Sequence, residues 1–103
     1  MAGWPLFNAR TIKYDPLFES AASAIQPDAK RLDAQLRGVE WAIATNPEAF
    51  EAIPETILRI LKTDSWPDAP SLRIYFSIDD ETMCTLRWIE IVEGPAEGED
   101  FSG

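Results

Sequence analysis

Four basic side chains and one tyrosine are the residues of this sequence whose types and spacing suit chemistry. Arg59 and Lys62 share one short apolar segment. Arg73 and Tyr75 share the next, and Arg87 lies in a third. On neighbouring strands, such cationic side chains could bind an anion or an acidic partner. All five are also candidates for a binding surface, although such side chains on strands are more often solvated or paired with acids.

The composition excludes several common kinds of site. The chain of 103 residues contains no histidine and one cysteine. Catalytic Ser-His-Asp and Cys-His sets, the common zinc sites and an internal disulfide are therefore excluded. We expect Cys84 to be a small buried hydrophobic residue. The acidic runs at 79–81 and 97–100 are explained by turn formation and by a solubilising tail, so we expect neither a metal nor another cofactor.

The net charge of −9 disfavours nucleic acid as a partner, because neutralising phosphates requires a surplus of Lys and Arg. Residues 93–103 carry four of the acids and no base. We expect one domain over residues 1–93 and a disordered acidic tail over 94–103. No apolar run approaches the length of about 18 residues that a membrane span needs, and no signal peptide is visible. The sequence therefore predicts a cytoplasmic protein without membrane contact.

Periodicity and turn signals divide the chain into short elements. Asp15-Pro16 is typical of a helix start. The segment at 53–63 is compatible with a helix or a strand. The other predicted elements are a strand at 10–14, helices at 16–25 and 28–45, and strands at 72–78 and 83–92. Helices followed by strands indicate an α+β fold, with a helical hairpin on one face of a small antiparallel sheet.

The turn between the last two strands decides which side chains face the core. A two-residue turn at 80–81 would bury Arg87, which is costly for a charge. A three-residue turn at 79–81 places Trp88 in the core opposite Leu72, and Arg73 opposite Arg87 on the outer face with Tyr75 beside them. Directly opposed arginines repel, so this register requires a nearby acid, a bound anion or an acidic partner.

The same register turns Glu90 inward and leaves Ile89 and Ile91 exposed beside the arginines. Either a partner covers the two isoleucines, or the N-terminal strand or the tail does. Trp41 lies off the apolar stripe of its helix; it either anchors a partner or packs sideways against the first helix, and we favour the packing. Trp66 lies in a proline-rich loop, and its role stays open.

The segment 72–92, LRIYFSIDDETMCTLRWIEIV, resembles the closing hairpin of RelE/ParE-superfamily toxins, the small toxins of bacterial type II toxin–antitoxin pairs. These hairpins have an apolar residue, Arg, a β-branched residue and an aromatic, then an acidic turn and an apolar strand. The upstream order is similar, with a helical hairpin ending in ATNPEAF and a strand like ILRILKT. The resemblance covers about residues 10–92. It implies a β-α-α-β-β-β fold and favours a strand at about 57–63.

The resemblance also implies roles for individual residues. RelE-like members are ribosome-dependent mRNA endonucleases that use basic residues on the sheet and a Tyr or similar group near the C-terminus. Arg73 matches the family arginine on the penultimate strand, and Arg59 and Lys62 lie where the family places basic residues. Arg87 does not clearly match a family position. The basic and aromatic groups after the last strand are missing here. ParE-like members inhibit DNA gyrase and need no catalytic set.

We therefore expect a toxin-like component of a type II pair, of the plasmid-stabilisation kind, that acts through protein–protein contact. Its partner would be a cognate antitoxin or another protein, and a gyrase-like target is favoured over RNA cleavage. The alternative is a non-toxic interaction module of the same fold, a small homodimer that uses Ile89 and Ile91. A third alternative is a ribosome-dependent endoribonuclease with a reduced active site, for which Arg73 and Arg87 are the catalytic candidates that the resemblance implies.

Overall fold

A computed structural model describes residues 9–29, 31–65 and 69–92 of the chain. The predictions for the N-terminal residues 1–8, for Trp66 and for the tail at 94–103 lie outside these described residues. Within them, the helices are too short or too polar to span a bilayer.

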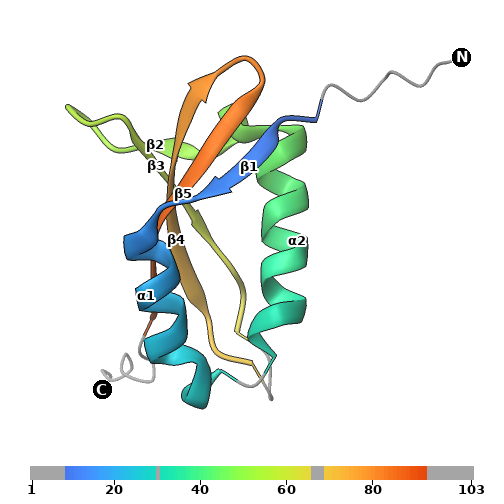
Figure 1. Cartoon of the computed structure of the whole chain (residues 1–103), viewed down its shortest axis with the longest axis vertical. Coiled ribbons are helices and arrows are strands. Elements are labelled where there is room, and N and C mark those ends of the chain that lie inside the picture. The colour runs from blue at the N-terminus through green and yellow to red at the C-terminus, as the bar shows by residue number, and fades with distance from the viewer. Residues whose placement is uncertain (1–8, 30, 66–68, 93–103) are drawn as a thin grey trace, which may run out of the picture.

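The described part of the chain forms an α+β arrangement of two helices and a five-stranded mixed sheet (Figure 1). The α-helices are α1 (Pro16–Ile25) and α2 (Leu32–Thr45), and two short 3-10 helices are η2 (Gln26–Asp28) and η3 (Pro47–Ala49). The strands are β1 (Thr11–Tyr14), β2 (Glu51–Ala52), β3 (Leu58–Lys62), β4 (Leu72–Asp80) and β5 (Met83–Ile91). The strand predicted at about 57–63 corresponds to β3, whereas β2 was not predicted.

The two helix starts show how local sequence acts. The bounds predicted for α1 are confirmed, because Asp15 caps the helix by accepting a hydrogen bond from the Leu17 N–H at 2.8 Å and Pro16 occupies the first turn. The predicted start of the second helix at residue 28 is wrong. Ala29 has φ −136° and ψ 77°, which is not helical, so η2 ends there and α2 begins only at Leu32.

The sheet has the strand order β1-β5-β4-β3-β2, and β1 runs parallel to β5. The prediction of a purely antiparallel sheet is therefore wrong at this edge. A parallel pair needs a long crossover, and the chain between β1 and β5 contains both helices and three strands. β2 is a two-residue edge strand that pairs with Arg59 and Ile60 of β3.

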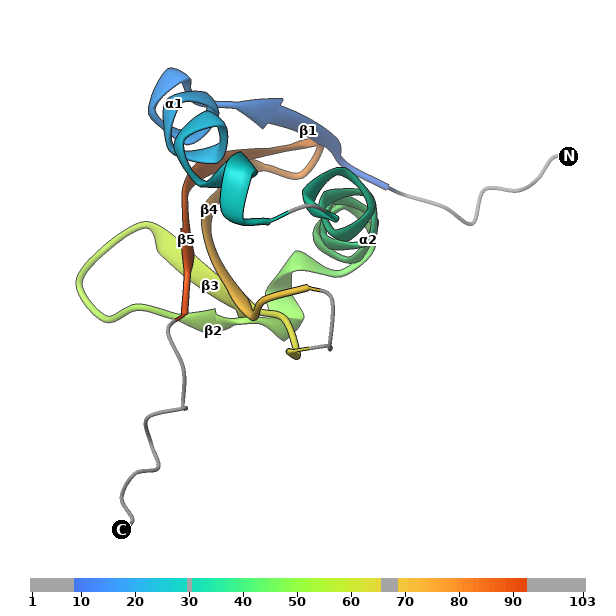
Figure 2. The same ribbon diagram turned by 90° about the horizontal axis from the view of Figure 1, so that it is seen from below.

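Both helices share one core with the sheet. Phe18 of α1 and Ile43 of α2 belong to the same buried cluster as Ile74, Phe76 and Leu86 of the central strands. Figure 2 shows α2 end-on, inside the curve of the sheet. Both helices therefore contribute to one core, and we call the side of the sheet away from this cluster the outer face. The predicted packing of the two helices as a hairpin is not among the main contacts of the described residues, in which α1 packs on β5 and α2 contacts β1 and β5.

The register of the β4–β5 hairpin differs from the predicted one. The turn has two residues, Glu81 and Thr82, and the pairing shifts between Tyr75 and Phe76 and again between Ile78 and Asp80. The first shift leaves Arg87 as an extra residue, because Tyr75 pairs with Trp88 while Phe76 pairs with Leu86. A bulge of this kind resets the alternation of faces, which the sequence pattern alone did not reveal.

Four predictions about side-chain direction are therefore wrong. Trp88 is 43% exposed rather than in the core, and Ile89 is 1% exposed rather than on the outer face. Ile91 packs against the core cluster. Glu90 points outward and pairs with Arg73, which replaces the predicted opposition of two arginines.

Two further predictions, for Trp41 and Cys84, do not depend on the hairpin register and have opposite outcomes. Trp41 is 68% exposed, so the prediction that it packs against α1 is wrong. Cys84 is fully buried, which confirms the prediction of a small hydrophobic residue, and burial raises the pKa of its thiol.

Candidate functional site

The outer face of the sheet is organised in cross-strand rows. Residues paired across neighbouring strands share a face, so the register places three rows on the side away from the helices. The central row is Ile60, Tyr75 and Trp88; the rows beside it are Lys62, Arg73 and Glu90, and Leu58, Ser77 and Thr85. Three of the predicted site residues, Lys62, Arg73 and Tyr75, are brought together here.

One carboxylate organises the middle of this face. Glu90 accepts a hydrogen bond from Tyr75 at 3.1 Å and pairs with Arg73 at 3.0 Å through the same oxygen. Its second oxygen accepts from the Trp88 indole at 3.3 Å. Tyr75 and, to a smaller degree, Glu90 raise the pKa of Arg73, so the guanidinium stays charged in the folded protein. We call these four residues, Arg73, Tyr75, Trp88 and Glu90, the aromatic–ionic cluster.

The predicted site residue Arg87 belongs to a second, separate group. Its guanidinium lies 3.1 Å from Asp15 and 3.6 Å from Asp79, and its Nε donates to the Ser77 hydroxyl at 3.0 Å. Thr85 donates to Asp79 as well. These contacts tie the bulged residue to the start of α1, so Arg87 stabilises the hairpin geometry and is not free to bind an anion.

The two basic residues of β3 point in different directions. Arg59 pairs with Phe76 across the sheet, and its guanidinium donates to the Phe50 carbonyl at 2.7 Å. Arg59 is therefore not part of the outer-face rows. Lys62 is exposed on the outer face, and among the described residues its ammonium has no ion-pair partner.

The predicted isoleucines do not line the site. Ile89 and Ile91 project toward the helices, next to the core residues that they contact. Trp88 is the outer-face residue that the sequence did not predict, since it was expected in the core. Trp88 and Glu90 are two residues apart and share one face of β5 in either register, but the bulge at Arg87 turns that face outward.

The arginines near the outer face are paired with acids. Arg73 and Arg87 are each neutralised by carboxylates. No cluster of three or more His, Cys, Asp or Glu side chains that would hold a metal ion occurs in residues 9–29, 31–65 and 69–92. The accessible side chains of this face include the ring of Trp88, which lies across from Tyr75, and the Arg73–Glu90 ion pair beside them.

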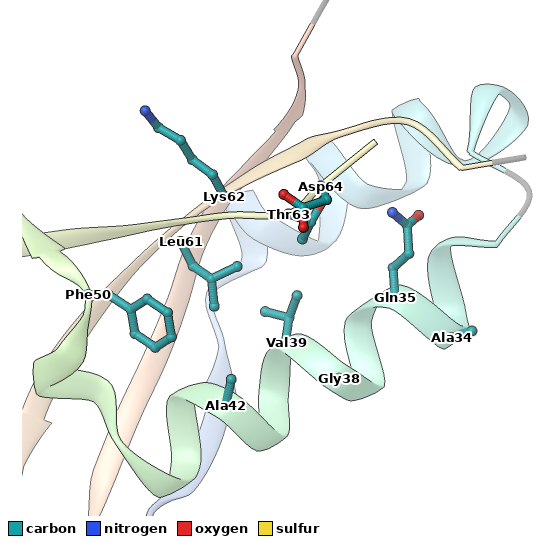
Figure 3. Close-up of a pocket in the computed structure, with 10 residues that line it drawn as sticks. All are labelled: Ala34, Gln35, Gly38, Val39, Ala42, Phe50, Leu61, Lys62, Thr63 and Asp64. Carbon is teal, nitrogen blue, oxygen red and sulfur yellow. The ribbon is translucent and has the colours of Figure 1, made fainter. Parts of the chain in front are cut away.

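A cleft of about 400 Å³ lies on the other side of β3, between that strand and α2 (Figure 3). Its walls include Val39 and Ala42 of α2, Leu61 of β3, and Phe50 at one end. Lys62 borders the cleft, but its side chain points away from it in Figure 3. Gly38 leaves the helix wall open, since a Cβ there would meet nothing within 4 Å. The sequence signal for this cleft is the spacing of small residues along α2, which was not recognised.

No family model, no curated protein and no solved structure matches this chain. The resemblance to RelE/ParE toxins therefore stays a prediction.

Proposed function

We propose that the protein is a toxin-like, RelE/ParE-like component of a type II toxin–antitoxin pair, and that it acts by binding another protein through the outer face. The support for the fold assignment is the order of one strand, two helices and a closing set of antiparallel strands. A cognate antitoxin and a gyrase-like target are the two classes of partner in this proposal.

The observation that carries the proposal is the pair Tyr75 and Trp88. The two rings lie directly across from one another on the outer face, and the Trp88 side chain keeps a large exposed fraction although the helices offer a core on the other side. Trp, Tyr and Arg dominate the binding energy of protein interfaces. Glu90 holds both rings and Arg73 in fixed positions, which lowers the entropy lost on binding.

The charges around this pair favour a protein over RNA. A nuclease of the RelE type needs cationic groups that are free to meet a phosphate, whereas Arg73 and Arg87 are engaged by Glu90, Asp15 and Asp79. An RNA partner would also face the repulsion of a chain with net charge −9. The endoribonuclease alternative is therefore the weakest of the three.

The homodimer alternative requires a surface other than the predicted isoleucines. Ile89 is buried in the core, so a dimer cannot use it without unfolding the sheet. The aromatic–ionic cluster is then the surface for a second copy as well, because it presents both an acid and a base. Sedimentation equilibrium of the isolated chain separates the two cases. A stable dimer that Trp88→Ala dissociates favours the interaction module.

The test of the toxin proposal is tightly controlled expression of the chain alone in bacterial cells. We expect growth arrest with the natural sequence and recovery with Trp88→Ala, because truncating a central interface Trp weakens binding by about 2 kcal/mol, or roughly 30-fold. Arg73→Ala should act in the same direction. Leu17→Ala is the matched control, since Leu17 is exposed on α1 and does not lie on the sheet.

Folding of each variant is checked by circular dichroism before growth is compared. Arrest that persists unchanged in Trp88→Ala and Arg73→Ala would contradict binding through the outer face. Absence of arrest with soluble, folded protein, in hosts that include the natural one, would contradict the toxin role. RNA-cleavage and DNA-replication assays during arrest then separate the two toxin classes.

A further inference from the structure

Strand β3 has an open backbone edge beyond the end of β2. β2 pairs only with Arg59 and Ile60, and the chain that precedes β2 belongs to the 3-10 helix η3. On the opposite side of β3, the Thr63 N–H donates to the Leu72 carbonyl at 2.9 Å. Because backbone groups alternate between the two edges of a strand, the N–H and C=O of Lys62 point away from β4. Among the described residues, no segment pairs with Lys62 on that side.

The apolar cleft lies along this same edge. Its walls include Val39 on α2 and Leu61 on β3, and Phe50 closes one end (Figure 3). Lys62 borders the cleft through its backbone, while its side chain points to the other side of β3. Successive side chains of a strand point to opposite faces. A strand added beside Lys62 would therefore direct alternate side chains into the cleft and the others to the outer face.

The row of charges that ends at this edge lacks an acid. It consists of Lys62, Arg73 and Glu90, with Arg73 between the other two. Glu90 pairs with Arg73 at 3.0 Å, whereas the Lys62 ammonium has no ion-pair partner among the described residues. Lys62 and Arg73 are also directly opposed across two strands, which is unfavourable for like charges. An acid opposite Lys62 on an added strand would complete the row.

We propose that the β3 edge at Lys62 binds an extended segment of a partner protein in which one acidic residue lies between two apolar residues. The segment adds a strand to the sheet. Its acid pairs with Lys62 on the outer face, and the flanking apolar side chains occupy the cleft. Main-chain hydrogen bonds give affinity in this mode of recognition, and side-chain pockets give specificity. The inference does not rest on the toxin proposal, because a non-toxic interaction module can bind the same segment.

A second copy of the chain fits this edge poorly. Two β3 edges that pair about a twofold axis at Lys62 would place the two ammonium groups opposite one another. Lysines on edge strands commonly prevent self-pairing of this kind. An acidic partner segment instead makes an attractive contact with the same side chain.

The first test is nuclear magnetic resonance of the isotopically labelled full chain with two pools of blocked seven-residue peptides. Both pools carry Val, Ile, Leu or Phe on either side of the central residue and Ser or Thr elsewhere. The central residue is Asp or Glu in the acidic pool and Lys or Arg in the basic pool. The net charge of −9 favours the basic pool in general, so a preference for the acidic pool reports the local charge at Lys62.

We expect the acidic pool to shift the Lys62 amide and the methyl groups of Val39 and Leu61, and to slow hydrogen exchange of that amide. Absence of shifts at millimolar peptide, shifts confined to another surface, or an equal response to the basic pool would overturn the proposal. Protection of the Lys62 amide that rises with protein concentration without peptide would assign the edge to a second copy, and would overturn it too.

Variants then separate the parts of the site, using the tightest peptide of the acidic pool. Lys62→Glu should weaken its binding by about fivefold or more, and Lys13→Glu is the matched control, with the same change of net charge on edge strand β1. Gly38→Phe, which fills the cleft from α2, should abolish binding, whereas Gly38→Ala should retain it. Gly38→Leu replaces Gly38→Phe if circular dichroism shows that the larger residue prevents folding.

The peptide backbone is tested without changing any side chain. N-methylation at one of the three central amides removes a strand hydrogen bond and should weaken binding by about tenfold. Equal weakening by Lys62→Glu and Lys13→Glu would contradict the pairing with Lys62. Full binding by all three N-methylated peptides would contradict strand addition.

Discussion

Substitutions at Trp88 and Ile89 give the sharpest test of the hairpin register, because these neighbours exchange places between the two alternatives. In the structure Ile89 is enclosed by the core, whereas Trp88 lies on the outer face with its indole bonded to Glu90. The predicted three-residue turn would instead bury Trp88 and expose Ile89. The two registers thus make opposite predictions for the same pair of variants.

The magnitudes follow from burial. Truncating a fully buried Ile to Ala lowers the free energy of unfolding by about 2–5 kcal/mol, and the complete burial of Ile89 places it in the middle of that range. Trp88→Ala removes a half-exposed ring from the position across the sheet from Tyr75, which is a loss of about 1 kcal/mol. A core Trp would have given about 3–5 kcal/mol.

The assay is urea denaturation followed by far-UV circular dichroism, which does not depend on the fluorescence of the substituted Trp. With a slope of about 2 kcal/mol per molar urea, Ile89→Ala should move the midpoint by roughly 1.75 M and Trp88→Ala by about 0.5 M. Ile89→Val is the graded control, with a loss of about 0.5–1.5 kcal/mol, and it stays measurable if the alanine variant does not fold. A larger loss for Trp88→Ala than for Ile89→Ala would refute the bulged register.

Two further predictions concern acids at element ends. Asp15→Ala should lower the free energy of unfolding by about 1–2 kcal/mol, because it removes the cap on the Leu17 N–H and the ion pair to Arg87. Asp15→Asn keeps the cap, so in urea denaturation it should lose less than half as much. Hydrogen bonds from the backbone and hydroxyl of Thr82 lower the pKa of Asp80 in the folded protein. The ionised carboxylate therefore stabilises the fold above the unfolded-state pKa of Asp80, and this stabilisation is lost as the pH falls below about 4. The melting-temperature difference between the natural protein and Asp80→Asn should therefore shrink toward low pH, and a constant difference from pH 6 to 2 would contradict this.

The elements were predictable where local signals act alone. Asp15-Pro16 defines the start of α1 through a cap and a fixed φ, both of which depend only on neighbouring residues. The alternation around Ile74 likewise indicated a strand in β4. The parallel pairing of β1 with β5 was not predictable in this way, because it depends on where the two-helix crossover returns the chain.

The site was predictable only in part, because its side chains depend on the register. Arg73 and Tyr75 were identified from the alternation of β4, and the structure places both on the outer face. Their acidic partner was not identified. The sequence-based register required some group to offset two opposed arginines, and the structure supplies Glu90 for Arg73 and a separate set of acids for Arg87.

The bulge at Arg87 links the fold to the proposed interface. Without the extra residue, the faces of β5 would alternate uniformly from Leu86 onward, and Trp88 would share the core side with Leu86. With it, Ile89 enters the core and Trp88 joins Tyr75 on the outer face. The contacts of Arg87 with α1 and β4 hold the bulge in place, so a residue first considered for catalysis acts as a positioning group for the aromatic pair. The ion pairs of Arg87 with Asp15 and Asp79 therefore compete with phosphate binding, and they also hold the geometry on which the proposed protein interface depends.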